Sequence, residues 1–330
     1  MKPEQLLGAE WTARLDRLTL STARRVRGTR QGRRRSRELG ASLEFADYRE
    51  YSPGDDVRRF DWSVYGRTGR KVVRQYLDEQ ELQVTLYLDC SQSMAFADEG
   101  APTPSPHASR LADEPASTPS RHASRLADEP PPTKLLHASR LAASIGYMAL
   151  AGYDRLGVYR VGARVGEGLP LLRGRPAVHR MLNFLAASEP EGRGDLAEAF
   201  GERSRLPRLP GMAWVFSDCW TERGEEELEE ALARLQAARQ EVVLVQVVTR
   251  GEIEPRLSGD LKLIDAELGT AKEAALTGRL LEAYEREFAA YRGRLAEFCA
   301  RRGIAYVLAP TDVPVREIVL GTLREQGWVR

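Results

Sequence analysis

Cysteine and histidine are scarce in this chain, and their scarcity excludes several kinds of site. The three cysteines among 330 residues are widely separated and form neither a disulfide framework nor a zinc-binding pattern. Three of the four histidines lie in copies of one repeat. We therefore expect no catalytic centre or ligand set built on histidine. We interpret Cys90 and Cys219 as small buried side chains in a reducing compartment.

Long apolar runs are also absent. No segment approaches the roughly 20 apolar residues that a membrane-spanning helix needs, and the amino terminus lacks the apolar core of a secretory signal. Hydrophobic residues make up 42% of the sequence and charged residues 29%, which is ordinary for a soluble globular protein. The sequence therefore predicts a cytoplasmic protein without a membrane span.

Two common catalytic motifs are missing as well. The sequence contains neither the Gly-x-Ser-x-Gly elbow of a serine hydrolase nor the Gly-x-x-x-x-Gly-Lys loop that binds nucleotide phosphates. These absences favour a protein that is not an enzyme.

The most informative stretch runs from Val84 to Met94. It opens as a near-continuous apolar run rich in β-formers, typical of a strand buried on both faces. The run ends at Asp89, and Ser91 and Ser93 follow in an Asp-x-Ser-x-Ser pattern. Because ligands of open α/β sheets bind beyond the carboxyl ends of the strands, these oxygens indicate a site for a hard cation such as Mg²⁺. The alternative is a strand-to-turn boundary where Asp and Ser cap the backbone locally.

A second apolar run, residues 213–217, repeats this design and is followed by Asp218. In a parallel sheet this strand can lie beside the first one, so that Asp89 and Asp218 emerge close together at the same edge. Two adjacent carboxylates repel each other unless a cation or a proton lies between them. The second acid therefore strengthens the prediction of a cation site.

Strands and helices are expected to alternate along most of the chain. Further strands are predicted at residues 71–77, 156–161, 168–172, 242–248, 261–265 and 304–308, with 168–172 at an edge because it contains a proline. Helices are predicted at residues 3–20, 134–151, 177–187, 225–239, 280–301 and 315–326. Another helix is predicted to open at residues 191–196, with Asp195 near its N-cap. This alternation predicts an α/β fold with a doubly wound, mostly parallel sheet of the Rossmann type, flanked by helices.

The first 80 residues differ in composition from residues 81–330, and we assign them to a small α+β module with an N-terminal helix. Eight arginines and no acid occur from Arg24 to Arg37. This run indicates a solvated segment or a strip for an acidic partner, with polyanion or nucleic-acid binding as an alternative. Aromatic residues then alternate with Arg and Asp around a Pro-Gly turn. We interpret Asp55, Asp56 and Asp61 there as structural partners of arginines, and Asp55 as the cap of a short helix.

Residues 97–132 interrupt the second domain and are rich in Pro, Ser and Ala. Copies of His-Ala-Ser-Arg-Leu-Ala begin at His107, His122 and His137, fifteen residues apart, and the third lies in the helix predicted at 134–151. The simplest interpretation is the duplication of a helix start, which leaves a disordered or partly helical loop beside the candidate site.

The segment Phe45–Arg58 (Phe-Ala-Asp-Tyr-Arg-Glu-Tyr-Ser-Pro-Gly-Asp-Asp-Val-Arg), with Asp61-Trp62 and Leu88–Met94, resembles the bacterial DUF58 family. That family combines this aromatic-acidic signature with a von Willebrand factor A-like domain, and this chain is similar to its shorter type, which lacks two N-terminal membrane helices. The resemblance implies a metal-ion-dependent adhesion site for Mg²⁺ or Mn²⁺. It also implies a MoxR-type AAA+ ATPase as partner in chaperone-like complex maturation of an unknown client.

By this resemblance, Asp89, Ser91 and Ser93 supply the first loop of the site and Asp218 supplies the last. The middle element departs from the family pattern. Relatives commonly have a Gly-Thr-Asp-like segment whose threonine hydroxyl completes the shell of the ion, whereas residues 193–195 here are Arg-Gly-Asp. Because Gly194 has no side-chain oxygen, we expect Asp195 or a water to compensate. Alternatively, Arg193 neutralises the acids without any metal.

The sequence therefore predicts a non-enzymatic protein–protein interaction module with an adhesion-type metal site. One alternative is a metal-dependent, phosphatase-like hydrolase of the cytosol that uses Asp89. Against it, phosphatases of the haloacid dehalogenase type need a second acid two residues on, where this chain has Ser91. The other alternative is polyanion or nucleic-acid binding through Arg24–Arg37.

Overall fold

The computed structural model describes residues 1–22, 31–80, 82–98, 131–162, 164–201, 206–221, 224–255, 259–264, 271–276 and 278–330. Residues 24–30 of the predicted arginine-rich segment lie outside these ranges. Residues 99–130 of the predicted insertion also lie outside them, together with the repeat copies that begin at His107 and His122.

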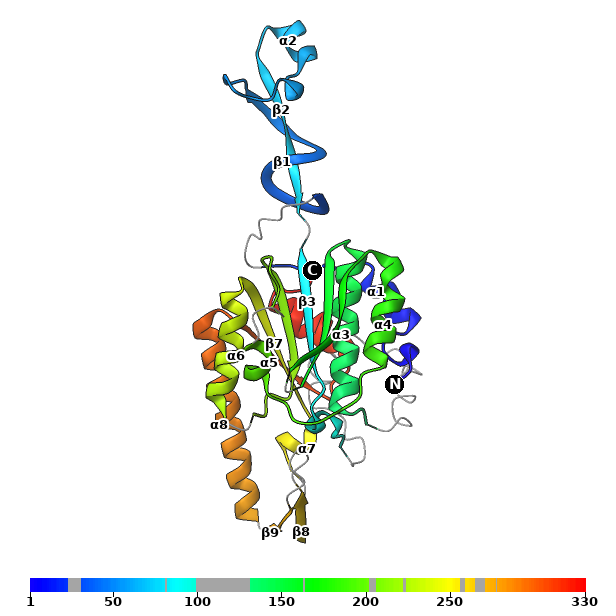
Figure 1. Cartoon of the computed structure of the whole chain (residues 1–330), viewed down its shortest axis with the longest axis vertical. Coiled ribbons are helices and arrows are strands. Elements are labelled where there is room, and N and C mark those ends of the chain that lie inside the picture. Colours follow the sequence, from blue (N-terminus) through cyan, green and yellow to red (C-terminus); the bar gives the residue numbers. More distant parts are fainter. Residues whose placement is uncertain are drawn as a thin grey trace, which may run out of the picture.

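One six-stranded sheet forms the centre of the molecule, with the strand order β10-β7-β6-β3-β4-β5 (Figure 1). Its strands are β3 (Gln83–Asp89), β4 (Arg155–Val161), β5 (Val165–Arg173), β6 (Gly211–Ser217), β7 (Gln240–Val248) and β10 (Ala305–Pro310). All neighbours pair in parallel except β4 and β5, which are antiparallel. The predicted mostly parallel α/β sheet is therefore confirmed, and so is the edge position of the proline-containing strand.

Helices cover both faces of this sheet (Figure 1). One face packs against α1 (Ala9–Leu15), α3 (Lys134–Ala151), α4 (Val178–Ala186) and the C-terminal turns α9 (Val315–Glu317), a π-helix (Ile318–Thr322) and α10 (Leu323–Glu325). The other face packs against α5 (Leu196–Gly201), α6 (Glu225–Ala237) and α8 (Gly278–Arg302). A short helix α7 (Arg250–Ile253) follows β7.

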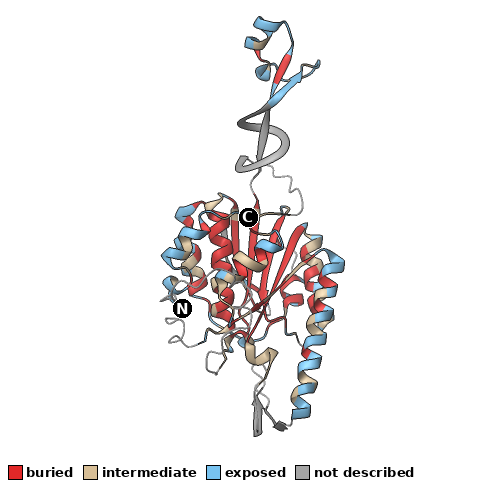
Figure 2. Ribbon diagram, turned by 180° about the vertical axis from the view of Figure 1, so that it is seen from behind, coloured by how far each residue is buried: buried red, intermediate tan, exposed pale blue. Residues whose placement is uncertain are grey.

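The two faces of β3 show why its sequence is a nearly continuous apolar run. Leu86 and Leu88 belong to the core on the α3 side, whereas Tyr87 belongs to the core on the α6 side, and all three are fully buried. A strand covered on both faces needs apolar side chains at every position rather than at alternate ones. Figure 2 shows this buried layer running through the sheet and the inner faces of its helices.

Three predicted elements differ in the structure. The helix predicted at 3–20 is divided into a 3₁₀ turn (Pro3–Gln5) and α1, because the backbone of Gly8 between them is extended. The helix predicted at 315–326 contains the π-helical turn. The strand predicted at 261–265 does not join the main sheet: β8 (Gly259–Ile264) pairs with β9 (Ala271–Leu276) in a separate antiparallel hairpin.

A second hairpin precedes β3, formed by β1 (Gln31–Glu50) and β2 (Val72–Gln80). Its tip carries a 3₁₀ turn η2 (Val57–Arg59) and the helix α2 (Trp62–Thr68). The predicted N-terminal helix is not part of this module, because Trp11 of α1 donates a hydrogen bond to Ser144 of α3. The hairpin meets the sheet at the amino end of β3, opposite the candidate site (Figure 1).

Candidate functional site

Asp89 and Asp218 lie where two neighbouring strands of the sheet end. Asp89 is the last residue of β3 and Asp218 follows β6, which pairs directly with β3. The side chains of both acids are buried. The structure therefore brings together the two acids that the sequence predicts at one edge.

The carboxylate of Asp89 accepts two hydrogen bonds. Its Oδ1 accepts from the backbone N–H of Ser91 at 2.9 Å, and its Oδ2 accepts from the hydroxyl of Ser217 at 2.6 Å. The hydroxyls of Ser91 and Ser93 lie 3.0 Å apart. The first of these bonds is the local cap that the alternative interpretation predicts, but the serine hydroxyls and Ser217 extend the group into a polar cluster.

The environment of Asp89 favours the neutral carboxyl. Burial raises the pKa of Asp89 to about 6, and the neighbouring charge of Asp218 acts in the same direction. The hydrogen bonds from Ser217 and Ser91 oppose this rise without cancelling it. Perturbed carboxyls of this kind concentrate at functional sites.

Sequence reasoning missed a further member of the cluster, Lys134, the first residue of α3. Its ammonium donates to Oδ2 of Asp218 and to Oε1 of Glu252, both at 2.7 Å, and its side chain is only 2% exposed. Burial lowers the pKa of Lys134, but the carboxylates of Asp218 and Glu252 outweigh burial and leave the pKa above its usual value. A signal exists in the sequence, because Lys134 is one of only five lysines in a chain rich in arginine.

Hydrogen bonds connect this lysine to two loops at the edge. The backbone N–H of Lys134 donates to the carbonyl of Phe96 at 2.9 Å. Glu252 lies in α7, where its second carboxylate oxygen accepts from the N–H of Thr249 at 2.7 Å. Asp98 accepts from the first two N–H groups of α7, each at 2.8 Å. The loop after β3, the start of α3 and the start of α7 are thus held in one arrangement.

Gly194, which offers no hydroxyl ligand, lies against the site. A Cβ atom at this glycine would lie 3.0 Å from Cβ of Ser91 and 3.7 Å from Oδ1 of Asp89. Asp195 caps α5, as the sequence predicts, because its Oδ1 accepts from the N–H of Glu198 at 2.6 Å. Arg193 is exposed, and the cation that pairs with Asp218 is Lys134.

These residues fit a divalent ion only in part. Asp89 and the two serine hydroxyls present oxygens, which Mg²⁺ and Mn²⁺ prefer. However, one oxygen of Asp218 is engaged by Lys134, and Gly194 contributes none. Within the described ranges, no group of three or more His, Cys, Asp or Glu side chains is arranged to hold a metal ion.

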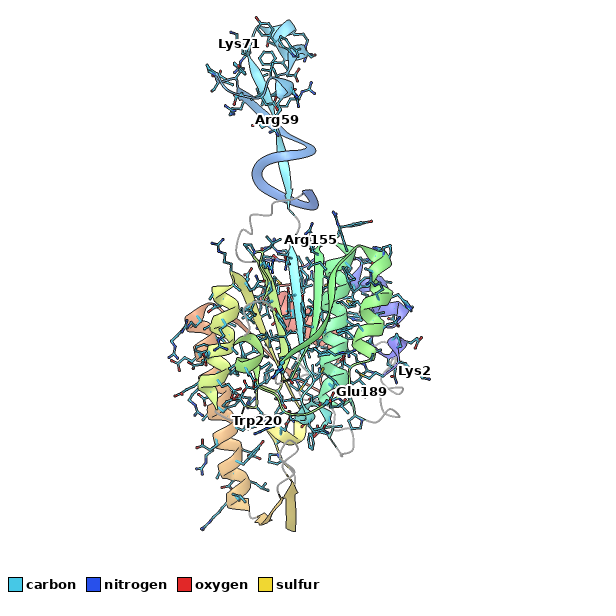
Figure 3. All side chains as sticks on the ribbon, viewed as in Figure 1. Lys2, Arg59, Lys71, Arg155, Glu189 and Trp220 are labelled. Carbon is cyan, nitrogen blue, oxygen red and sulfur yellow. The ribbon has the colours of Figure 1, made fainter. Side chains whose placement is uncertain are left out.

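Exposed aromatic side chains flank this buried cluster. Trp220, two residues after Asp218 and labelled in Figure 3, is 41% exposed. Its ring stacks on those of Phe288 and Tyr291 of α8. Phe96 is 50% exposed, and the ammonium of Lys134 lies 6.0 Å from the centre of its ring. Aromatic side chains are enriched in surfaces that bind other proteins.

The cysteines beside the two acids are buried thiols. Burial raises the pKa of Cys90 to about 12 and raises the pKa of Cys219 still more clearly above its usual value. Because the thiolate is the reactive form, both side chains are held in the unreactive form. Their burial agrees with the structural role that the sequence suggests.

The acids of the hairpin tip form caps and ion pairs. Asp61 accepts from the guanidinium of Arg74 at 2.7 Å and from two N–H groups at the start of α2. Asp56 caps η2, and Asp55 accepts from Arg49 at 2.6 Å. The prediction that these acids pair structurally with arginines is therefore confirmed for Asp55 and Asp61, although Asp55 does not cap the helix as predicted.

Comparisons with known proteins give one family and several relatives. The family model "Protein of unknown function DUF58" matches residues 47–102 and 124–294. Uncharacterized protein Rv1480 of Mycobacterium tuberculosis and uncharacterized protein Mb1516 of Mycobacterium bovis are each 30% identical over 303 residues, which cover 91% of this chain and 84% of theirs. The family match includes the hairpin tip and both acids of the site.

Two solved structures are similar at 16% sequence identity. One is the conserved hypothetical protein BatB from Bacteroides thetaiotaomicron, with a TM-score of 0.38, 72% of this chain covered and 98% of that chain. The other is an aerotolerance-related membrane protein from Bacteroides fragilis, with a TM-score of 0.40, 74% of this chain covered and 100% of that chain. In the part of this chain that the structure describes, no helix has the length and apolarity needed to cross a membrane.

Proposed function

Because this chain belongs to the DUF58 family, we propose that it works as a non-enzymatic protein–protein interaction module. The observation that carries the proposal is the edge formed by the ends of β3 and β6. There a buried polar cluster around Asp89 and Asp218 is bordered by the exposed rings of Phe96 and Trp220. This edge is the docking surface, and its exposed aromatic rings supply contact area for the partner.

We infer further that the α/β domain is of the von Willebrand factor A-like type. Support comes from the sheet, in which only the edge strand β5 is antiparallel, and from the Asp-x-Ser-x-Ser loop after β3. Open α/β sheets generally bind their ligands beyond the carboxyl ends of the parallel strands. The proposed docking surface lies at that end of the sheet.

An ion held by Asp89, Ser91 and Ser93, with Asp218 across the site, would offer a coordination position to an Asp or Glu of the partner. Mg²⁺ and Mn²⁺ suit these oxygen ligands. The chain's own residues orient the first loop: Ser217 fixes one oxygen of Asp89, and the N–H of Ser91 fixes the other. The aromatic rim is a separate part of the docking surface and contains none of the residues that would hold this ion.

The hydrolase alternative is supported less well. A nucleophilic or basic carboxylate has to reach its substrate, whereas Asp89 is 3% exposed and both of its oxygens accept hydrogen bonds. Ser91 stands where a phosphatase of the haloacid dehalogenase type carries its second acid.

We propose a MoxR-type AAA+ ATPase as the partner, in the maturation of protein complexes in the cytoplasm. The resemblance of the signature around Pro53-Gly54 supports this choice. The test is binding of a purified MoxR-type ATPase from the same organism to the full chain, measured by biolayer interferometry with and without Mg²⁺. We expect Phe96→Ala and Trp220→Ala each to weaken binding at least tenfold, because aromatic anchors dominate interface energetics.

The matched control is Leu209→Ala. Leu209 is 43% exposed, like Trp220 at 41%, but it precedes β6 at the opposite edge of the sheet. Binding should survive this change. If all three variants bind the ATPase as the unchanged chain does, the docking surface lies elsewhere on the molecule.

A further inference from the structure

The ammonium of Lys134 lies within the site where a metal ion would balance the charge of two aspartates. It is 2.7 Å from Oδ2 of Asp218, and Asp218 also raises the pKa of Asp89 through its charge. A second carboxylate, that of Glu252, lies 2.7 Å from the same ammonium. The site therefore already contains one positive charge that belongs to the protein.

We infer that Lys134 is the built-in cation of this site and that a divalent ion binds well only when the ammonium leaves Asp218. The inference rests on the metal-dependent part of the proposed function. Two cations that shared the carboxylate of Asp218 would repel each other strongly, because burial removes most of the screening by water. Lysine and metal ion thus compete for one carboxylate.

The lysine is firmly placed for this role. It begins α3, Thr133 caps that helix by accepting from the N–H of Leu136, and the N–H of Lys134 is bonded to Phe96. A buried ammonium between two carboxylates is difficult to remove, since Asp218 would be left buried, and Glu252 partly buried, without its partner. The long and flexible side chain nevertheless allows the ammonium to move while the helix stays in place.

The opposite wall of the site agrees with this inference. Gly194 lies 3.7 Å, measured from a Cβ built on it, from Oδ1 of Asp89, and it lacks the hydroxyl that the family pattern supplies. The chain therefore has one oxygen ligand fewer and one internal cation. The absent oxygen ligand and the internal cation both lower the affinity of the site for a divalent ion.

The experiment is a titration of the full chain with Mn²⁺. Binding is measured by calorimetry and by the electron paramagnetic resonance signal of free Mn²⁺. We expect weak binding by the unchanged chain and at least tenfold tighter binding by Lys134→Met. Adding Asp89→Asn to that variant should remove the gain. Lys71→Met, which changes an exposed lysine in the N-terminal hairpin, is the matched control and should bind Mn²⁺ as the unchanged chain does.

The variant Lys134→Met/Glu252→Gln decides the question if Lys134→Met does not fold. It removes the ammonium together with one of its two acids, and it leaves Asp89 and Asp218 for the ion. Mn²⁺ should raise the melting temperature of this double variant and leave that of the unchanged chain almost unaltered. Equal Mn²⁺ affinity in the unchanged chain and in the double variant would overturn the inference, whether that affinity is high or too low to detect.

The two proposals fail separately. If Lys134→Met does not change the Mn²⁺ affinity, Phe96→Ala and Trp220→Ala are still expected to weaken ATPase binding, because those variants test the aromatic rim without metal. Conversely, a chain that binds no ATPase can still show the gain of Mn²⁺ affinity on removal of Lys134.

Discussion

Two buried aspartates in different parts of the molecule have opposite electrostatic environments. Asp61 at the hairpin tip is 2% exposed, and Asp89 at the sheet edge is 3% exposed. The guanidinium of Arg74, followed by the N–H of Val64, holds the pKa of Asp61 well below its usual range. Burial and the charge of Asp218 raise the pKa of Asp89 to about 6. Burial alone therefore does not distinguish a structural acid from a functional one.

The difference lies in the partners. Asp61 has a cation, two N–H groups and the hydroxyl of Tyr48 as donors, so its negative charge is compensated where it sits. Asp89 has two donors and a like charge nearby, and the cation of the cluster pairs with Asp218 and Glu252 instead. An acid that is compensated locally supports the fold, whereas an acid left with unbalanced charge can respond to a proton, an ion or a partner.

The largest expected effect is the difference in stability between two variants, each of which lacks the cation of one region: Lys134 at the sheet edge or Arg74 at the hairpin tip. Lys134→Met leaves the buried Asp218 and the partly buried Glu252 without their partner, and it should lower the free energy of unfolding by about 3–5 kcal/mol, chiefly through Asp218. Arg74→Met should cost much less, because the side chain of Arg74 is 45% exposed and water can replace it. Urea denaturation of both variants at pH 7 measures the comparison. Equal losses would mean that the two ion pairs are equivalent despite their different burial.

The second prediction concerns pH and has opposite signs for the two acids. Because the folded state raises the pKa of Asp89 from 3.8 to about 6, this acid contributes stability below about pH 4 that is lost as the pH rises through 6. The rise of about 2 pH units corresponds to at most about 3 kcal/mol. Asp61 has a lowered pKa, so its contribution is present above about pH 4 and is lost as the pH falls.

Urea denaturation at a series of pH values from 4 to 8 tests this prediction. Over this interval the buried imidazole of His137, whose pKa burial lowers to about 3, acts in the opposite direction, because the unfolded chain then binds the additional proton. The test is therefore the difference between two proteins: from pH 4 to pH 7, Asp89→Asn should gain more stability, or lose less, than the unchanged chain. Asp61→Asn is the control and should follow the pH dependence of the unchanged chain over this interval. A profile of Asp89→Asn parallel to that of the unchanged chain would show that Asp89 does not contribute.

Local patterns in the sequence predicted one of these regions better than the other. The apolar runs before Asp89 and Asp218 place both acids at one edge, because parallel strands end on the same side of a sheet. The pairing of hairpin acids with arginines also follows from residues close in sequence: Asp61 and Arg74 are 13 positions apart. Such contacts can be anticipated from composition and spacing.

Lys134 could not be predicted in the same way. It is 84 positions from Asp218 and 118 positions from Glu252, and the contact forms only after three separate elements have packed at the sheet edge. Its helix was predicted over the observed bounds, 134–151, but a lysine at a helix start is ordinarily a solvated side chain. The apolar periodicity thus predicts that Lys134 begins a helix, but it does not predict that its side chain is buried. The cap formed by Asp195, in contrast, is a local contact, and the sequence predicts it correctly.

The smallest expected effect comes from placing a hydroxyl at position 194, where glycine offers no oxygen ligand. The added Cβ of Gly194→Thr would lie 3.0 Å from Cβ of Ser91, so the loop has to shift slightly and the free energy of unfolding should fall by about 1–2 kcal/mol. Gly194→Ala has the same Cβ without the hydroxyl, and it separates the steric cost from the effect of the oxygen.

In the Lys134→Met background, Gly194→Thr should bind Mn²⁺ more tightly than Gly194→Ala, because the hydroxyl adds an oxygen ligand. With Lys134 present, the two variants should bind Mn²⁺ equally weakly, since the ammonium still occupies Asp218. If threonine instead strengthened Mn²⁺ binding to the same degree with and without Lys134, the missing hydroxyl rather than the lysine would set the affinity. In that case the weak Mn²⁺ binding at the sheet edge would be caused by the absent oxygen ligand, and not by the ammonium that pairs with Asp218.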